Sequence, residues 1–180
     1  MQATTIGTGY VSRSCTKATL REKHRAIEAF LTAHGYRVAE VTLSFGDYAY
    51  NAPYARCLAK NDQAGIEQLK QSYLEGASQS LEQGKTLSNL VFGRDIKHVM
   101  LLHIGSFETV MLPQLLELLK QRGFILVTLP EAESDPAYSL HPDLPSKWEG
   151  TFLDQMIAAR HLSPPKNAGD GLAKLDGLCQ

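Results

Sequence analysis

The sequence predicts an α/β fold with parallel strands. Segments of helical periodicity alternate with short apolar runs in the order helix–strand–helix–strand–helix–strand, which is typical of parallel sheets. The second run, HVMLLHIG (98–105), is apolar almost throughout, as expected for a central strand that is covered on both faces. The 180 residues, of which 43% are hydrophobic and 21% charged, suit one globular domain.

The first predicted helix begins at a Thr16 or Thr19 cap and ends at about His34, before Gly35. Apolar residues recur along it at helical spacing: Ala26, Ile27, Phe30 and Leu31. A strand over 37–45 follows. Its alternate residues are apolar, which is the pattern of a strand with one face in the core.

An ordered loop is expected over 46–57, which carries three tyrosines, an asparagine, a proline and a glycine. A long helix follows over about 61–83. Gly65 and Gly76 weaken this helix by roughly 1 kcal/mol each relative to alanine, so its packed face must hold it in place. That face is predicted to be Ile66, Leu69, Tyr73, Ala77 and Leu81.

The third predicted helix covers 108–123, with Pro113 tolerated in its first turn and Gly123 as its stop. Its leucines are expected to be buried: Leu112, Leu115, Leu116 and Leu119. The run FILVTL (124–129) is the third predicted strand.

Three regions are expected along the chain. Residues 1–15 show no sustained period and are predicted to be poorly ordered, and the domain itself covers 16–140. Residues 141–180 form a tail rich in Pro and Gly, of which 163–180 is predicted to be disordered. Trp148 is expected to anchor this tail to the domain.

Charge and hydropathy disfavour several classes of protein. Lys and Arg (18) nearly balance Asp and Glu (19), and a net charge of −1 with a pI near 6.6 disfavours nucleic acid and anionic lipid as partners. No apolar run is long enough to span a membrane. The N-terminus lacks the basic start and apolar stretch of a signal peptide, and localisation stays open.

Spacing excludes several chemical motifs. The run 84–86 (GKT) resembles the end of a phosphate-binding loop, but Gln79 stands where that loop needs its first glycine. His98 and His103 are five residues apart on a predicted strand, so they point to opposite faces and do not chelate one metal together. Three cysteines are too few and too scattered for a disulfide framework or a zinc site: Cys15, Cys57 and Cys179.

His103 lies at the C-terminal end of a strand that is otherwise made of Val, Met and Leu. Reactive residues of parallel α/β proteins gather at the carboxyl ends of strands. Asp47 follows the end of the first predicted strand, so the two side chains are expected to meet above the sheet. A buried carboxylate bonded to an imidazole fixes its tautomer and stabilises its protonated form. A hydrogen-bonded core histidine is the more common outcome, and the residues alone leave the function open.

Four segments occur in one order over roughly residues 19–140: VTLSFGDYAYNAPYARC (41–57), LVFGRDI (90–96), HVMLLHIGSF (98–107) and RGFILVTLPEAESDPAY (122–138). Together they resemble the C-terminal half of a polysaccharide deacetylase, in the NodB-homology group called carbohydrate esterase family 4. The resemblance implies a distorted (β/α) barrel, opened here by loss of its N-terminal strands. It also implies hydrolysis of N-acetyl groups on chitin- or peptidoglycan-type sugars with a divalent metal, usually zinc.

The resemblance implies a partial site. Leu101 would line an acetyl pocket, and His103 would act as the general acid on the leaving amine. Asp47 would be the carboxylate that tunes this histidine, and Tyr48 replaces a tryptophan that walls the pocket. Tyr50 is a further candidate for contact with the sugar.

The chain also departs from the family pattern. It lacks the Asp-Asp pair and the H-[ST]-x-x-[HD] motif that supply the base and the metal ligands, and Ser44 replaces the first aspartate of the motif around Asp47. The Arg–aromatic–Pro motif is represented only by 13–15 (RSC). Without a metal to activate water, His103 has no nucleophile to assist. We therefore expect no metal cofactor, and a deacetylase-like chain that is inactive alone.

Two alternatives remain. A non-catalytic module would stack sugar rings on the tyrosines of the loop: Tyr48, Tyr50 and Tyr54. An active complex would take its missing motifs from a partner chain, or other ligands would converge in space: His24, His34 or His141. The expected partners are an acetylated oligo- or polysaccharide and a second copy of the chain that covers the open edge of the truncated sheet.

Overall fold

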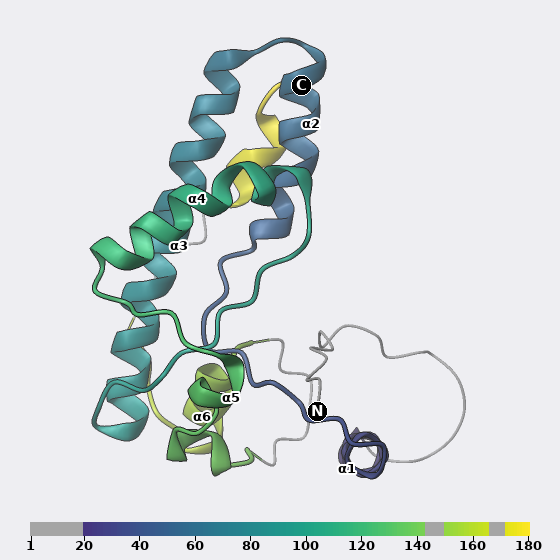
Figure 1. Ribbon diagram of the computed structural model, residues 1–180, viewed down its shortest axis with the longest axis vertical. Coiled ribbons are helices and arrows are strands. Elements are labelled where there is room, and N and C mark those ends of the chain that lie inside the picture. The colour runs from purple at the N-terminus through teal and green to yellow at the C-terminus, as the bar shows by residue number, and fades with distance from the viewer. Residues whose placement is uncertain (1–19, 143–149, 166–171) are drawn as a thin grey trace.

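The computed structural model describes residues 20–142, 150–165 and 172–180, and over these ranges the chain is mainly helical (Figure 1). The α-helices are α1 (Leu20–Ala33), α2 (Asn51–Ala59), α3 (Gln63–Phe92), α4 (Ser106–Gln121), α5 (Leu129–Ala132) and α6 (Phe152–Ala159). Short 3₁₀ helices lie between and after them: η1 (Asp47–Tyr50), η2 (Pro136–Ser139) and η3 (Leu172–Gly177).

Helix α3 contributes side chains to two hydrophobic cores, which lie one after the other along its length (Figure 1). The first core lies between its N-terminal part, α2, α4 and η3, and its largest fully buried members are Tyr50, Tyr73, Phe107, Leu69, Leu81, Met111 and Leu115. The second lies between its C-terminal turns, η2 and α6, and contains Leu87, Val91, Ile96, Ala137, Phe152, Leu153, Met156 and Ile157.

The helix predicted over 61–83 is confirmed and extends further, to Phe92. Asp62 caps its first turn by accepting a hydrogen bond from the Gly65 amide at 2.9 Å. Every residue of the predicted apolar face is buried. The same pattern continues through Leu87 and Val91, which the predicted boundary left out.

The run 84–86 lies in the middle of α3 and not in a loop. A Cβ atom at Gly84 would clash with the side chain of Leu43, so this glycine lets the 41–45 segment approach the helix closely. These residues are therefore not part of a phosphate-binding loop, and close packing against Leu43 explains the glycine at position 84.

The predicted α/β barrel is wrong. Over the described ranges the chain forms no sheet, and the first two predicted strands meet only at an isolated parallel bridge between Leu43 and Met100. The main-chain amides of Thr42 and Leu43 donate to Val99 O at 2.9 and 3.0 Å, and the Leu101 amide donates to Leu43 O at 3.0 Å.

The physical reason is a shortage of neighbouring strands. The third predicted strand, 124–129, pairs with no other described segment, and Ile125 and Leu126 are 87% and 66% exposed. A parallel ladder is stable when several strands satisfy one another's main-chain groups and helices cover both faces. Because the described residues form no sheet, they offer no sheet edge for the expected second copy to cover, although apolar side chains of 124–129 are exposed.

Helix α4 confirms the third predicted helix but begins earlier, at Ser106. Pro113 consequently lies beyond the first turn, where it has no amide to donate to the Thr109 carbonyl. Leu115 and Leu119 are buried as predicted, whereas the other two leucines are exposed: Leu112 by 43% and Leu116 by 40%.

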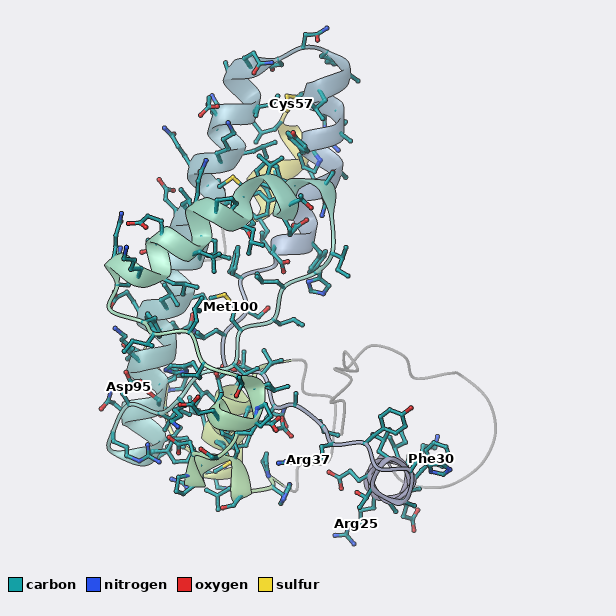
Figure 2. All side chains as sticks on the ribbon, viewed as in Figure 1. Arg25, Phe30, Arg37, Cys57, Asp95 and Met100 are labelled. Atoms are coloured by element: carbon teal, nitrogen blue, oxygen red, sulfur yellow. A yellow bond between two sulfur atoms is a disulfide. The ribbon has the colours of Figure 1, made fainter. Side chains whose placement is uncertain are left out.

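Helix α1 stands apart from the other helices (Figure 1). It ends as predicted, with Gly35 in the left-handed region at φ 77°. The apolar residues that predicted this helix are largely exposed, since Ile27 is 54% and Phe30 60% exposed. Figure 2 shows Phe30 on this separate helix, and its ring packs on the neighbouring His34 ring at 4.1 Å between centroids.

The C-terminal region is more ordered than the sequence predicted. Thr151 and Asp154 form a reciprocal capping box at the start of α6, whose apolar side chains enter the second core. The expected disorder over 163–180 is wrong for 172–180, where Leu175 is 2% exposed in the first core. Residues 1–15 and Trp148 lie outside the described residues. Among the described helices, none has the length and apolar character to cross a bilayer.

A disulfide joins Cys57 in α2 to Cys179, with 5.1 Å between their Cα atoms. The cysteine count excluded a disulfide framework and gave no sign of this single bond. Cys57 is fully buried, and its sulfur is bonded to Cys179.

Candidate active site

Asp47 is placed by a tight turn at the end of the first extended segment. Gly46 adopts φ 70°, a left-handed conformation that favours glycine, and its carbonyl accepts the Ala49 amide at 3.0 Å. The chain then enters η1, of which Asp47 is the first residue. This turn directs Asp47 inward, and its side chain is 0% exposed.

His103 meets Asp47 at two points. Asp47 Oδ2 accepts the main-chain amide of His103 at 2.6 Å, and Asp47 Oδ1 lies 2.9 Å from His103 Nδ1. The predicted contact between these side chains is therefore confirmed, although it is made without a sheet beneath it. Because an ionised carboxylate only accepts hydrogen bonds, Nδ1 carries the proton. The imidazole is 43% exposed, and its Nε2 has no hydrogen-bond partner among the described residues.

The predicted substrate-binding residues differ in exposure. Tyr48 is 60% exposed, and its ring meets the His103 ring edge-on at 5.1 Å between centroids. Leu101 is half-buried. Tyr50 is 1% exposed and stacks on Phe107 at 5.8 Å in the first core, so it offers no face to a sugar. The prediction that Tyr50 contacts substrate is therefore wrong.

A second polar group beside the pair escaped the sequence reasoning. Asn51 Nδ2 donates to Glu108 Oε2 at 2.7 Å, and Asn51 Oδ1 accepts the Phe107 amide at 3.0 Å. A Cβ atom at Gly105 would clash with both side chains. This arrangement fixes the start of α4 next to His103. The available signal was Glu108, which lies on the same face of α4 as the buried Met111 and Leu115.

Tyr73 completes the buried surroundings. Its side chain is 0% exposed, and its hydroxyl has no hydrogen-bond partner among the described groups; Glu108 Oε1 shares this property. Burial, and to a lesser extent the nearby carboxylates of Asp47 and Glu108, raise the pKa of Tyr73. The phenol therefore stays neutral at any physiological pH.

The described residues do not fit a zinc site. Both oxygens of Asp47 are engaged by His103, and no group of three or more His, Cys, Asp or Glu in the described ranges has the geometry to hold a metal ion. His34, which directly follows α1, bonds through Nδ1 to Phe30 O of that helix at 2.7 Å. A surface hollow of about 450 Å³ lies between α1 and the residues around Tyr138, and neither Asp47 nor His103 lines it.

Two further polar contacts are structural. Arg94 forms a two-pronged ion pair with Asp135 at 2.5 and 2.9 Å, which strongly lowers the pKa of the Asp135 carboxyl. His98 is buried between Asp95 and Thr42, at 3.0 and 3.2 Å from its ring nitrogens. Burial lowers the pKa of His98, against the opposing effect of Asp95.

Comparison of this chain with protein-family models, with curated proteins and with solved structures gives no match.

Proposed function

We propose that this chain is a polysaccharide deacetylase-like protein that carries the proton-donating half of a deacetylase site. The observation that supports this most is the two-point contact between Asp47 and His103. It holds His103 by its main chain and by Nδ1, and Nε2 of the partly exposed ring has no hydrogen-bond partner among the described residues. The four segments that resemble the family include both residues.

In this proposal His103 serves the leaving group. When its ring is protonated, Nε2–H donates a proton to the amine nitrogen of an N-acetylated sugar as the amide C–N bond breaks. Asp47 is a positioning residue, because its two oxygens hold the main chain and the ring of His103. Attack on the acetyl carbon needs an activated water, and no described residue is arranged to supply one. We therefore expect the isolated chain to leave acetamides intact.

The first experiment measures metal content and acetate release together. The purified chain is analysed for zinc and incubated with chitotetraose, with and without added zinc. The proposal expects neither stoichiometric metal nor acetate. One zinc per chain together with acetate release, lost in His103→Asn, would overturn it, because a complete site would then exist.

The second experiment tests for the sugar itself. Chitotetraose is titrated into the chain while ring signals of its histidines are followed by NMR. We expect the His103 signals to shift and those of His141, which is exposed outside the site, to stay unchanged. Equal shifts, or none at millimolar sugar, would contradict a deacetylase-like site.

A non-catalytic carbohydrate-binding module is the second candidate, favoured by the exposed Tyr48 ring beside the site. Aromatic faces pack against sugar rings. A binding module loses affinity in Tyr48→Ala and keeps it in His103→Asn, whereas the deacetylase-like site needs both side chains. Tyr36→Ala is the matched control, because Tyr36 is 42% exposed and lies elsewhere.

A further inference from the structure

The C-terminal segment Leu172–Gln180, called here the C-terminal latch, is fastened to α2. Cys179 is bonded to Cys57, and the Arg56 guanidinium donates to the main-chain oxygens of Leu175, Asp176 and Leu178 at 3.2, 3.3 and 3.2 Å. Figure 2 shows Cys57 on α2, where the latch passes. Leu175 enters the first core from the latch.

The start of α3 is shaped to admit the disulfide. A Cβ atom at Gly65 would lie 2.5 Å from Cys179 Sγ, a distance that no side chain tolerates. Glycine within a helix is destabilising by roughly 1 kcal/mol relative to alanine. A glycine at position 65 therefore leaves room for Cys179 to pack against the helix.

The other end of the latch reaches the candidate active site. A Cβ atom at Gly46 would lie 2.6 Å from Leu172 Cδ1, so the Leu172 side chain rests directly on Gly46. Gly46 forms the left-handed turn that begins η1. Leu172 thus packs on the residue that immediately precedes Asp47.

We propose that the C-terminal latch is a redox-sensitive positioning device: the Cys57–Cys179 disulfide holds Leu172 on Gly46, and this contact keeps Asp47 in place to orient His103. The inference rests on the site that underlies the proposed function, but not on the reaction which that site assists. It assigns the disulfide a role at the site, about which the two cysteine positions alone give no information.

A small dithiol reduces the Cys57–Cys179 disulfide and so frees the latch from its covalent bond to α2. Cys57 is fully buried and Cys179 is half-buried, so a thiolate of the dithiol attacks the Cys179 sulfur and the S–S bond breaks. Cys57 leaves as a thiolate and takes up a proton. The second thiol of the dithiol then displaces Cys179, which also ends as a thiol. Two electrons and two protons pass to the protein, and the dithiol becomes a disulfide.

After reduction the latch is held only by non-covalent contacts, namely hydrogen bonds from Arg56 and Lys60 and the apolar packing of its leucines against the first core. Hydrogen bonds from Arg56 to main-chain oxygens compete with water, and Asp176 and Gly177 are exposed. The 3₁₀ helix η3 is too short to be stable by itself. We therefore expect the latch to loosen and the contact between Leu172 and Gly46 to open more often, while the second core, which contains no described residue of the latch, changes little.

Amide hydrogen exchange tests this without any activity. The His103 amide donates to Asp47 Oδ2, so its exchange reports directly on the position of Asp47. On reduction with dithiothreitol we expect its exchange to accelerate by roughly tenfold or more, with the amides of α6 changing less than about twofold. Exchange that rises in the latch while the His103 amide stays protected would overturn the proposal.

Variants separate the disulfide from the contact. Cys57→Ala/Cys179→Ala should reproduce the reduced state, and Cys15→Ser, which spares the disulfide, should behave as the parent chain. Leu172→Ala keeps the disulfide and removes the contact with Gly46, so it should accelerate His103 exchange even under oxidising conditions. An unchanged His103 amide in Leu172→Ala, or two free thiols at Cys57 and Cys179 in the oxidised protein by mass spectrometry, would also overturn it.

These outcomes are independent of the proposed function. A chain that binds no sugar but shows coupled exchange keeps the latch and loses the deacetylase-like site. A chain that binds sugar at His103, but whose His103 amide exchange is unchanged by reduction, keeps the deacetylase-like site and loses the latch.

Discussion

The carboxylate of Asp47 fixes which ring nitrogen of His103 carries the proton. Its two oxygens accept two donors, the His103 amide and Nδ1–H. In Asp47→Asn only one oxygen remains, and the main-chain amide is an obligatory donor that takes it. The amide NH₂ of asparagine then faces Nδ1, which must become the acceptor. We expect the neutral ring to move its proton to Nε2, seen in ¹⁵N–¹H correlation spectra of the imidazole.

The same substitution should cost about 1–2 kcal/mol of unfolding free energy, since a charge-assisted bond is replaced by neutral ones. Glu117→Gln serves as the control, because it also replaces a carboxylate by an amide but on the exposed face of α4. An Asp47→Asn ring that keeps its Nδ1 proton would show that another group sets the tautomer.

Two buried tyrosines of the first core form a matched pair for testing hydrogen bonds. Tyr50 Oη pairs with Ser72 Oγ at 3.1 Å, whereas the Tyr73 hydroxyl has no partner among the described groups. Tyr50→Phe should therefore lower the free energy of unfolding by about 1 kcal/mol, and Tyr73→Phe should leave it unchanged or raise it by up to about 1 kcal/mol. Urea denaturation measures both. Equal losses would mean that Tyr73 also makes a bond.

Single residues were predictable from sequence where their position follows from an element boundary. Asp47 and His103 each stand at the end of an apolar run, and runs that lie side by side bring their ends together whether or not a ladder forms. Asn51 and Arg56 were not predictable in this way. Both are polar residues in a segment expected to be a loop, and only tertiary contacts show that they hold α4 and the C-terminal latch.

At the scale of elements, helical periodicity predicted which stretches form helices and most of the side chains that these helices bury. The faces of α3 and much of α4 follow the 3.6-residue repeat, and their boundaries moved because capping and packing extend a helix beyond its clearest pattern. The strand pattern over 41–45 correctly placed Leu43 and Phe45 in the core. The strand predicted over 124–129 does not pair with another described segment. A helix satisfies its own main chain, whereas a strand depends on neighbours, which its own residues do not specify.

The contact between the two extended segments should weaken in acid because of His98. Burial lowers the pKa of this imidazole below its ordinary value of 6.5 in the folded chain, so the unfolded chain binds the proton first. The free energy of unfolding is unaffected by His98 above the pKa of the unfolded chain. It falls as the pH decreases below about 6.5 toward the lower pKa that His98 has in the folded chain. Denaturation curves at several pH values should show this loss.

His98→Gln identifies the group, since it removes the titration while keeping a polar side chain near Thr42 and Asp95. Its stability should change less than that of the parent between pH 7 and 5. Asp135 provides an internal check at lower pH: Arg94 lowers its pKa in the folded chain, so its contribution to stability is lost as pH falls from the ordinary carboxyl pKa toward the folded one, below the range of His98. A parent and variant with the same slope would show that His98 is not the source.

At the scale of the whole molecule, the disulfide closes most of the described chain into one loop. Cys57 and Cys179 are 122 residues apart, and a cross-link of this span limits the freedom of the unfolded chain far more than a short one. Reduction should lower the free energy of unfolding by about 2–4 kcal/mol. Urea denaturation with and without dithiothreitol measures this difference, and Cys57→Ala/Cys179→Ala should match the reduced protein in both media.

This stabilisation differs in origin from the positioning of Asp47, and one comparison separates them. Leu172→Ala leaves the cross-link intact, so it should keep most of the oxidised chain's stability while it loosens the turn at Gly46. If Leu172→Ala destabilised the chain as much as reduction does, the disulfide would act through that contact in the folded state and not by restricting the unfolded chain. A small loss, about 1 kcal/mol for a partly buried leucine, places most of the effect in the unfolded state.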